Sequence, residues 1–327
     1  MICDVRQNII ILRSQEDEMT ELVGYTGFVG SNIYACGGID KGYNSKNIEE
    51  AYGTEPDILV YAGMRAEKYL ANLHPSEDME FVYQAEANIR KISPKKLVLI
   101  STIDVFKNPQ GKNEDSDIDT EGLHAYGLNR FRLEQWAREK YPDALIIRLP
   151  ALYGAHIKKN FIYDIINIIP SMIKSDKYIE LSKRRPELYY YYMLEQNGFY
   201  KCRNLNPSEK KYLRAIFREL NFSALNFTDS RNKYQFYPLN RLWRDIQIAL
   251  EKNLKVWHPA TEPVSAAEIY QYLNGKKFYN IIGDYPVLYD YQTLYAKLFG
   301  KTGVYIMSKD EVLKDIKRFV EQMQLYA

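Results

Sequence analysis

The chain has 327 residues, of which 46% are hydrophobic and 26% charged, a composition typical of a soluble globular protein rather than a disordered one. Forty-four Lys and Arg residues balance 42 Asp and Glu residues, and the net charge of +2 disfavours nucleic-acid binding. Three cysteines without a CxxC motif argue against a disulfide framework or a cysteine-rich zinc site and favour a cytoplasmic protein. At roughly 150 residues per domain, the length predicts two structural units.

The first 18 residues have no signal-peptide pattern, because charged residues interrupt the start and no small-residue cleavage site follows. Met19 immediately precedes a short strand, expected to be buried, that leads into a glycine turn, so we interpret residues 1–18 as an N-terminal extension. An additional edge strand at residues 8–12 is the alternative. The longest apolar stretches, such as residues 161–170, are too short and interrupted to span a bilayer, and no membrane partner is predicted.

A glycine-rich turn follows the first strand and precedes a helix predicted over residues 27–36. Its GxxGxxG spacing supplies a tight turn, a close backbone approach to a pyrophosphate and close packing of the helix on the sheet. The helix N-terminus then offers N–H groups to phosphates. The residues of this turn expected at a cofactor are Gly24, Thr26, Gly27, Phe28, Val29 and Gly30.

The second strand should carry the residues that hold the adenosine ribose of a dinucleotide. Asp40 comes too early for this position, so we expect Asn44, Ser45 and Lys46 to line that edge. Lys46 either accepts a ribose phosphate, which favours NADP, or is solvated. The choice between NAD and NADP stays open.

Continuous apolar strands are predicted at residues 57–63, 96–100 and 144–149, alternating with helical segments. This pattern indicates a doubly wound parallel α/β sheet with helices on both faces. Ligands bind such sheets beyond the carboxyl ends of the strands. The residues at those ends, which should converge on one rim, are Ala62, Gly63, Ser101, Thr102, Tyr153 and Gly154.

Five motifs in this order resemble the extended short-chain dehydrogenase/reductase family, the NAD(P)-dependent sugar-nucleotide epimerases and dehydratases. They are GYTGFVGSN at 24–32, DILVYAG at 57–63, LVLISTIDVF at 97–106, YGLNR at 126–130 and RLPALYG at 148–154. The resemblance covers residues 19–270. It implies a Rossmann-type NAD(P)-binding domain formed by residues 19–157 and 226–262, and a smaller, helix-rich substrate or lid domain formed by residues 158–225 and 263–327.

The resemblance implies that Tyr126 is the acid/base, that Arg130 takes the place of the family's lysine, and that Thr102, with Ser101 beside it, contacts the substrate oxygen. Residues i and i+4 share a helix face, so Tyr126 and Arg130 can reach one pocket. A cation beside a phenol lowers a pKa that is about 10 in water. Arginine in place of lysine is one departure, and residues 81–82 lack the family's structural asparagine.

Further contacts follow from the same resemblance. The remaining residues expected at the cofactor are Tyr61, Ala62, Gly63, Ser101, Tyr126, Arg130 and Pro150. The residues expected at the substrate are Arg65, Asp104, Asn160 and Arg231. Asp104 as a loop-capping carboxylate and Arg65 as a solvated side chain are the alternatives. The four histidines have no metal-ligand spacing, and no metal is predicted.

In the second half, we predict an apolar helix over residues 161–173 interrupted at Pro170, an amphipathic helix around the aromatic run 189–192, a helix that begins at Asn206, and a helix over residues 310–324. The leading functional hypothesis is an NAD(P)-dependent epimerase or dehydratase of a nucleotide sugar. A non-catalytic dinucleotide-binding sensor or scaffold and a simple carbonyl reductase are the alternatives. By analogy with family dimers, helices at 76–92 and 125–140 could pair in a homodimer.

Overall fold

The computed structural model describes residues 18–195 and 197–325 of the chain. The segment expected as an N-terminal extension, with the alternative strand at 8–12, lies outside the described residues except for Glu18. The chain divides into two compact units. The described part of unit 1 comprises residues 18–156, 235–263 and 289–312, and that of unit 2 comprises residues 157–195, 197–234, 264–288 and 313–325.

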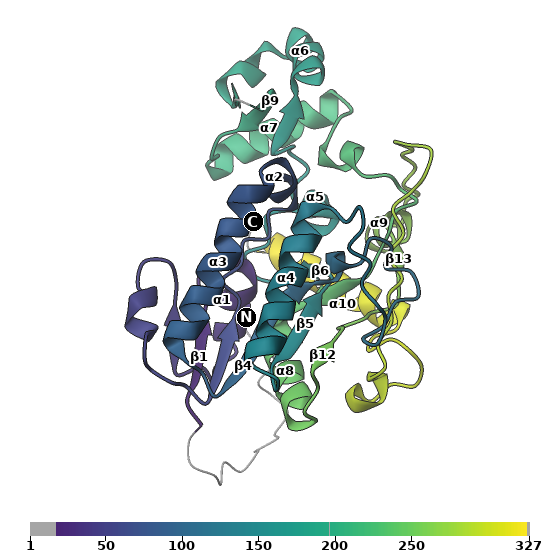
Figure 1. Ribbon diagram of the computed structural model, residues 1–327. Coiled ribbons are helices and arrows are strands. Elements are labelled where there is room, and N and C mark those ends of the chain that lie inside the picture. Colours follow the sequence, from purple (N-terminus) through teal and green to yellow (C-terminus); the bar gives the residue numbers. More distant parts are fainter. Residues whose placement is uncertain (1–17, 196, 326–327) are drawn as a thin grey trace. The chain divides into compact units, whose positions relative to one another are not determined.

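Unit 1 contains a parallel sheet and the helices that cover it (Figure 1). Its strands are β1 (Thr20–Val23), β2 (Lys41–Tyr43), β3 (Ile58–Tyr61), β4 (Lys96–Thr102), β5 (Leu145–Leu149), β6 (Ala151–Tyr153), β11 (Phe236–Pro238) and β12 (Val256–Trp257). Its helices are α1 (Phe28–Tyr34), α2 (Lys68–Leu73), α3 (Pro75–Ile92), α4 (Ala125–Lys140) and α8 (Leu242–Glu251). Helix α10 (Lys309–Leu325) begins in unit 1 and continues into unit 2.

The six strands of the main sheet follow the order β12-β5-β4-β3-β1-β2, and all neighbours are parallel. This confirms the predicted Rossmann-type doubly wound sheet. Val23 is in register with Tyr61, and Thr102 with Leu149, so the carboxyl ends of β1, β3, β4 and β5 lie along one edge. The strand order reverses between β1 and β3, where such sheets bind ligands. On the β2 side of that point the sheet has two strands, one fewer than the Rossmann order 3-2-1-4-5-6.

Alternate side chains of the strands fill two separate cores, as the two-residue period of a strand requires. Leu59, Leu97 and Ile146 pack under α3 and α4, which lie side by side over this face (Figure 1). Val60 and Val98 pack on the opposite face under α1 and α8. Helices on both faces explain why these strands read as continuous apolar runs in the sequence.

Unit 2 is smaller and mixed in structure. Its elements are α5 (Phe161–Ile166), β7 (Met172–Lys174), α6 (Ser175–Arg184), β8 (Tyr192–Leu194), β9 (Phe199–Cys202), α7 (Pro207–Glu219), β10 (Lys233–Tyr234), β13 (Val264–Ser265) and α9 (Ala266–Asn274). Strands β7, β9 and β8 form an antiparallel sheet, and β10 pairs with β13. The sheet and helices α6 and α7 enclose a core that includes Ile173, Leu181 and Phe217.

Several local predictions for the second half need correction. The helix expected over 161–173 ends at Ile166, because the chain turns at Pro170 and continues as strand β7. The aromatic run 189–192 forms the end of a 3-10 helix and the start of β8 rather than an amphipathic helix. Asn206 does cap α7, in a reciprocal capping box with Glu209, as predicted.

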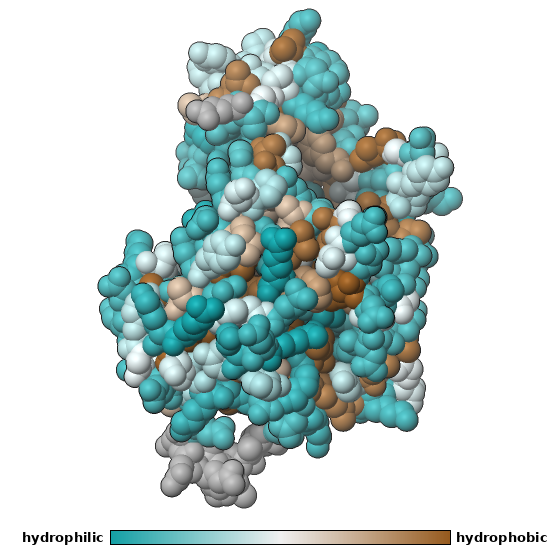
Figure 2. Space-filling model, viewed as in Figure 1, coloured by the Kyte–Doolittle hydropathy of each residue, from teal (hydrophilic) through white to brown (hydrophobic). Residues whose placement is uncertain are grey.

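The boundaries of the two units also differ from those expected. Residues 226–234 belong to unit 2, because β10 pairs there with β13. Residues 289–312 belong to unit 1, where Tyr291 is fully buried against Ile103 and Phe106. On the face of the molecule shown in Figure 2, hydrophilic residues predominate and hydrophobic residues form scattered groups between them.

Candidate active site

A cavity of about 120 Å³ lies in unit 1 where the carboxyl ends of β3, β4 and β5 meet the start of α1 and α4. The lining residues that the sequence placed at a cofactor, substrate or catalytic site are Val29, Ala62, Arg65, Ser101, Thr102, Tyr126, Arg130 and Pro150. The lining residues that sequence analysis missed are Met64, Ala66, Ile100, Leu149 and Leu152. Parallel strands that end together bring these distant segments to one place.

The glycine turn is closed tightly against the tip of β3. Gly24 has a φ of +93°, and a Cβ built on it would lie 2.5 Å from the Ala62 carbonyl oxygen. A Cβ on Gly30 would collide with the Gly24 carbonyl oxygen. Only glycine satisfies both requirements, so the turn and the cavity wall at Ala62 are fixed to each other. Gly27 is the N-cap of α1, and its carbonyl oxygen accepts a hydrogen bond from the Ser31 N–H at 2.9 Å.

The loop after β2 is organised by its own side chains. The Asn47 side-chain oxygen accepts from the Asn44 N–H, and the Asn44 side-chain oxygen accepts from the Lys46 N–H, both at 2.8 Å. Asp40 lies before β2, and its carboxylate accepts from the Thr20 N–H at 2.7 Å, which fixes the start of β1. Lys46 and Ser45 are exposed in this loop.

Tyr61 was expected at the cofactor, but its side chain points elsewhere. It is buried in the core under α3, and burial raises its pKa to about 12. It does not line the cavity. Because strand residues alternate between faces, Tyr61 falls on the α3 side of the sheet, and its neighbour Ala62 reaches the cavity instead.

Tyr126 sits in the first turn of α4. The Asn72 side-chain oxygen on α2 accepts its backbone N–H at 2.9 Å, and His124 caps the helix by accepting the Gly127 N–H at Nδ1, 3.0 Å away. The Tyr126 side chain is buried, which raises the pKa of its hydroxyl. The Arg130 charge and a hydrogen bond with Thr102 act in the opposite direction. Burial prevails, so the phenol keeps its proton at neutral pH.

Arg130 is paired with a residue that sequence analysis missed. Its guanidinium donates to both carboxylate oxygens of Asp78 on α3, at 2.9 and 3.0 Å, and both side chains are more than 90% buried. Its Nη2 also donates to the Arg65 carbonyl oxygen at 2.6 Å. Asp78 receives a further hydrogen bond from Asn129. The sequence did contain a signal for this pair. Asp78 lies one helical turn before Val82, and residues 81–82 are the position at which the resembled family has its structural asparagine.

The two hydroxyl residues at the end of β4 have different partners. Ser101 donates to Glu134 on α4 at 2.5 Å. Glu134 is fully buried and also accepts from the Arg148 guanidinium at 2.7 Å. Arg148 in turn contacts His258, whose pKa falls to about 3 because of burial and the arginine charge. Ser101 therefore belongs to a structural ion-pair network, and Thr102 is the hydroxyl associated with Tyr126.

Two of the residues expected at the substrate occupy the surroundings of this site. Asp104 does not line the cavity; its carboxylate pairs with Lys68 at 3.0 Å and accepts from the Tyr289 hydroxyl at 2.9 Å. Arg65 lines the cavity, and its guanidinium lies 4.3 Å from the centre of the Phe81 ring. Asp104 thus has structural partners, and Arg65 is held over α3 by a cation–π contact.

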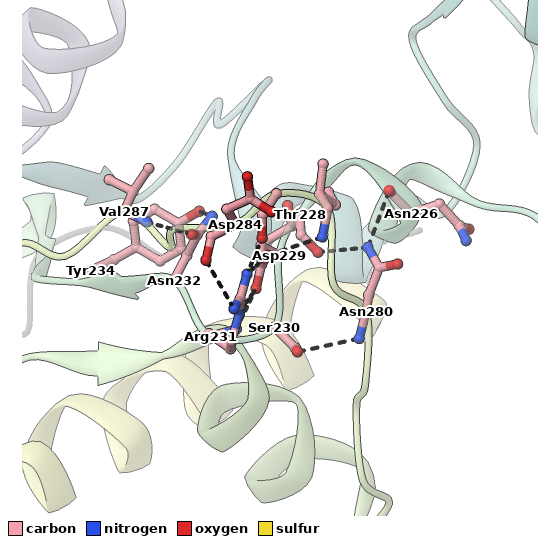
Figure 3. Close-up of polar contacts among 12 residues, drawn as sticks. Asn226, Thr228, Asp229, Ser230, Arg231, Asn232, Tyr234, Asn280, Asp284 and Val287 are labelled. Atoms are coloured by element: carbon pink, nitrogen blue, oxygen red, sulfur yellow. Dashed lines mark hydrogen bonds and ion pairs between the residues drawn. The ribbon is translucent and has the colours of Figure 1, made fainter.

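The other two expected substrate residues lie in unit 2. Asn160 caps α5: its side-chain oxygen accepts from the N–H groups of Ile162 and Tyr163 at 3.0 and 3.2 Å. Arg231 donates through Nε and Nη2 to both oxygens of Asp229, at 3.0 and 2.8 Å (Figure 3). This pairing lowers the pKa of the Asp229 carboxyl.

Arg231 also joins two loops of unit 2. It contacts the carbonyl oxygens of Gly283 and Asp284, while the Asn280 side chain donates to the Thr228 carbonyl oxygen at 2.8 Å (Figure 3). The described contacts of Arg231 are therefore structural ones that its sequence position alone did not reveal.

Comparisons with known proteins identify the fold. No protein-family model matches the sequence, and no curated protein sequence resembles it significantly. Among solved structures, dTDP-4-dehydrorhamnose reductase from Bacillus anthracis in complex with NADP is 16% identical with a TM-score of 0.60, covering 94% of this chain and 99% of that one. The chain has the fold of the extended short-chain dehydrogenase/reductases.

Two further structures with this extended short-chain dehydrogenase/reductase fold are epimerases. UDP-glucose 4-epimerase from Thermotoga maritima, solved with UDP-glucose, is 13% identical with a TM-score of 0.59, covering 94% of this chain and 99% of that one. UDP-N-acetylglucosamine 4-epimerase from Methanobrevibacter ruminantium, solved with UDP-N-acetylmuramic acid, is 12% identical with a TM-score of 0.57, covering 96% and 100%. The resemblance seen in the five motifs is thus confirmed at the level of fold.

Within residues 18–195 and 197–325, no helix combines the length and apolar character needed to cross a bilayer. In the same part of the chain, no group of three or more His, Cys, Asp or Glu side chains is arranged to hold a metal ion.

Proposed function

We propose that the protein is an NAD(P)-dependent reductase of a keto group on a nucleotide sugar. The observation that carries this proposal is the pairing of a buried, protonated Tyr126 hydroxyl with Thr102 in a cavity at the carboxyl ends of the strands. The fold is that of reductases and epimerases whose structures were solved with NADP or UDP-sugars, which supports the substrate class.

The residues of the cavity fit the nicotinamide end of such a cofactor. Val29, Ala62 and Pro150 provide apolar walls, and the backbone of the glycine turn lies against Ala62. Three described hydrogen bonds join Arg130 to Asp78 and Arg65. A guanidinium has five N–H donors, so Arg130 retains donors for ribose hydroxyls. When bound, the cofactor supplies the hydride that reduces the carbonyl carbon.

The adenosine end is expected at the loop after β2. No carboxylate follows β2 directly, because the loop begins with Asn44 and Ser45 and its first charged residue is Lys46. Asp40 lies before β2 and is bonded to Thr20. A carboxylate in this place binds the ribose hydroxyl of NAD, whereas a cation accommodates the phosphate of NADP. The loop therefore favours NADP.

Tyr126 is suited to donate a proton rather than to remove one. As the substrate carbonyl is reduced, its oxygen gains negative charge, and the Tyr126 hydroxyl transfers its proton to that oxygen. Thr102 holds the same oxygen by a hydrogen bond. Solvent then reprotonates Tyr126. An epimerase of this type begins instead with oxidation of a hydroxyl, which needs a phenolate as base, and the raised pKa of Tyr126 disfavours that step.

Dehydratase chemistry has less support. The first position of the acid/base pair after Thr102 is Ile103, and the second, Asp104, is occupied by Lys68 and Tyr289. A side chain with two structural partners is a poor donor for a leaving hydroxyl. A non-catalytic dinucleotide-binding protein is the alternative, and it differs from a reductase in that it binds the cofactor without turning over any substrate.

The test is to incubate the purified protein with NADPH or NADH and a panel of 4-keto nucleotide sugars, and to follow cofactor oxidation by absorbance. Turnover with at least one keto sugar is expected. Y126F should lower kcat by about 10²–10⁴-fold while cofactor affinity is unchanged. Y141F, at the other end of the same helix, is the matched control and should retain full activity. Cofactor binding without turnover of any substrate would support the non-catalytic alternative instead.

A further inference from the structure

We propose that Asp78 is a positioning residue that holds Arg130 against the ring of Tyr126 and balances its charge, so that the hydroxyl stays a proton donor and the site favours reduction. The direction of the reaction is the part of this inference that rests on the proposed function. The position of Arg130 and the protonation of Tyr126 do not depend on it.

Three hydrogen bonds to two partner groups fix the guanidinium of Arg130. Two parallel N–H···O bonds to Asp78 set the plane of the guanidinium, and the third bond, to the Arg65 carbonyl oxygen, sets its rotation. In this orientation the guanidinium carbon lies 4.7 Å from the centre of the Tyr126 ring. The guanidinium therefore faces the ring of Tyr126, and the carboxylate of Asp78 on the neighbouring helix α3 balances its positive charge.

Asp78 is itself well fixed. It lies on the buried face of α3, and its Oδ2 receives a hydrogen bond from the Asn129 side chain at 3.0 Å. Asn129 also donates to the Pro75 carbonyl oxygen at the start of α3. The pair thus joins α3 to α4 at the level of Tyr126, and α3 and α4 cannot slide without breaking it.

Several charged groups act on the Tyr126 hydroxyl, and they come from every element around it. Arg130 on α4 favours the phenolate, whereas Asp104, after β4, and Asp78, on α3, oppose it. Lys68 on α2 is paired with Asp104, and burial and Lys68 lower the pKa of His124, which keeps the helix cap neutral. Removal of the Asp78 charge leaves Arg130 as an unbalanced buried cation beside Tyr126.

The chemical consequence is a change in the rate of alcohol oxidation relative to the rate of carbonyl reduction. With the pair intact, a protonated Tyr126 can give its proton to the oxygen of a carbonyl that is being reduced. Without Asp78, the unbalanced guanidinium stabilises the phenolate, which accepts a proton from a hydroxyl that is being oxidised. D78N should therefore increase the rate of alcohol oxidation relative to carbonyl reduction.

The test measures Tyr126 directly by NMR on protein labelled with ¹³Cζ-tyrosine, with its resonance assigned by its absence from Y126F. Wild-type Tyr126 should ionise less than exposed tyrosines at the same alkaline pH, because burial raises the pKa of its hydroxyl. In D78N the titration midpoint should fall by at least about half a pH unit, which is roughly threefold more phenolate at a given pH. D78E should restore the wild-type titration. This readout needs no turnover, so it is independent of the proposed reaction.

Two further variants separate positioning from simple loss of stability. D245N removes a carboxylate that is equally buried and also paired with arginines, Arg241 and Arg244, but lies on α8. It should leave the Tyr126 titration unchanged. The double variant D78N/R130Q removes both charges, and because Arg130 acts on Tyr126 more strongly than Asp78 does, Tyr126 should ionise no more readily than in the wild type even if D78N alone unfolds.

The activity arm compares oxidation and reduction in D78N. A rise of about threefold or more in the ratio of the two kcat values is expected. The inference is overturned if D78N titrates as the wild type does, or if D78N/R130Q ionises as readily as D78N is expected to. A shifted titration without turnover of any substrate leaves the role of Asp78 intact and counts against the reductase.

Discussion

Ser101 and Glu134 are joined by a hydrogen bond of 2.5 Å inside unit 1, and this bond separates the functions of two adjacent hydroxyl residues. Ser101 and Thr102 follow each other at the end of β4, and both line the cavity. The buried carboxylate of Glu134 draws the Ser101 hydroxyl into a structural network with Arg148. Thr102 alone is associated with Tyr126.

This difference predicts that two similar substitutions differ mainly in their effect on kcat. T102A should lower kcat by about 10²-fold, the cost of removing one donor at a developing oxyanion. It should also lower the free energy of unfolding by about 0.5–2 kcal/mol, because the Thr102 side chain caps the turn after β4 by accepting the Asp104 N–H at 3.2 Å. S101A should leave kcat within a few-fold but destabilise the protein by roughly 1.5–3 kcal/mol, because a buried carboxylate loses a hydrogen bond. Steady-state kinetics and urea unfolding measure the two effects. Equal losses of activity would contradict the assignment.

R130K should not create a better enzyme. Lysine keeps the charge but cannot make the bidentate contact with Asp78 or reach the Arg65 carbonyl oxygen at the same time. We expect a loss of roughly 1–3 kcal/mol in the free energy of unfolding and lower kcat. Higher activity at unchanged stability would indicate a decayed lysine site instead.

The control for R130K is R132K on the same helix. Arg132 is exposed, and substitutions at such surface positions usually change stability by less than about 0.5 kcal/mol. Both variants remain cationic, so a difference between them reports the buried pair rather than net charge.

The glycine turn gives a matched pair of substitutions. Gly24 and Gly37 have φ values of +93° and +80°, so alanine is strained at both by about 1–3 kcal/mol. At Gly24 the new Cβ also collides with the Ala62 carbonyl, whereas at Gly37 it meets nothing within 4 Å. G24A should abolish the increase in Tm caused by NADPH, and G37A should retain it. A retained shift in G24A would show that the cofactor binds elsewhere.

Asp164 on α5 predicts a pH dependence of stability in unit 2. Burial raises its pKa from 3.8 to about 7, and no hydrogen bond or ion pair of its carboxylate is found within the described part of the chain. Between these values the folded state binds a proton that the unfolded state has lost. Stability therefore falls as pH rises from about 4 to about 7 and then levels off.

D164N should remove this part of the pH dependence and be more stable than the wild type above pH 7, as measured by thermal unfolding at pH 5 and pH 8. The matched control is D176N, because Asp176 is exposed at the start of α6 in the same unit. If D164N and D176N had the same pH profile as the wild type, the carboxyl would already be ionised in the folded state.

The arrangement of the sheet was predictable because its causes are local. The strands β3, β4 and β5 carry short runs of Leu, Ile and Val that are typical of strands buried on both faces, and the glycines near Gly24 mark the turn between strand and helix. The convergence of Ala62, Thr102 and Pro150 then follows from parallel topology. The homodimer through α3 and α4 stays a prediction.

What the sequence by itself determined was the doubly wound sheet and the rim where its strands end, because strand patterns and chain direction dictate them. The family resemblance added Tyr126 and Arg130, so part of the set of residues that meet at the rim was predicted. The tertiary structure decided which of those residues are already engaged. Arg130 meets Asp78 across 52 positions of sequence, and Ser101 meets Glu134 across 33. Pairings over such separations depend on how helices pack on the sheet, since no local periodicity encodes them. The physical reason is that a buried charge requires a partner, and only the folded chain determines which one lies within reach.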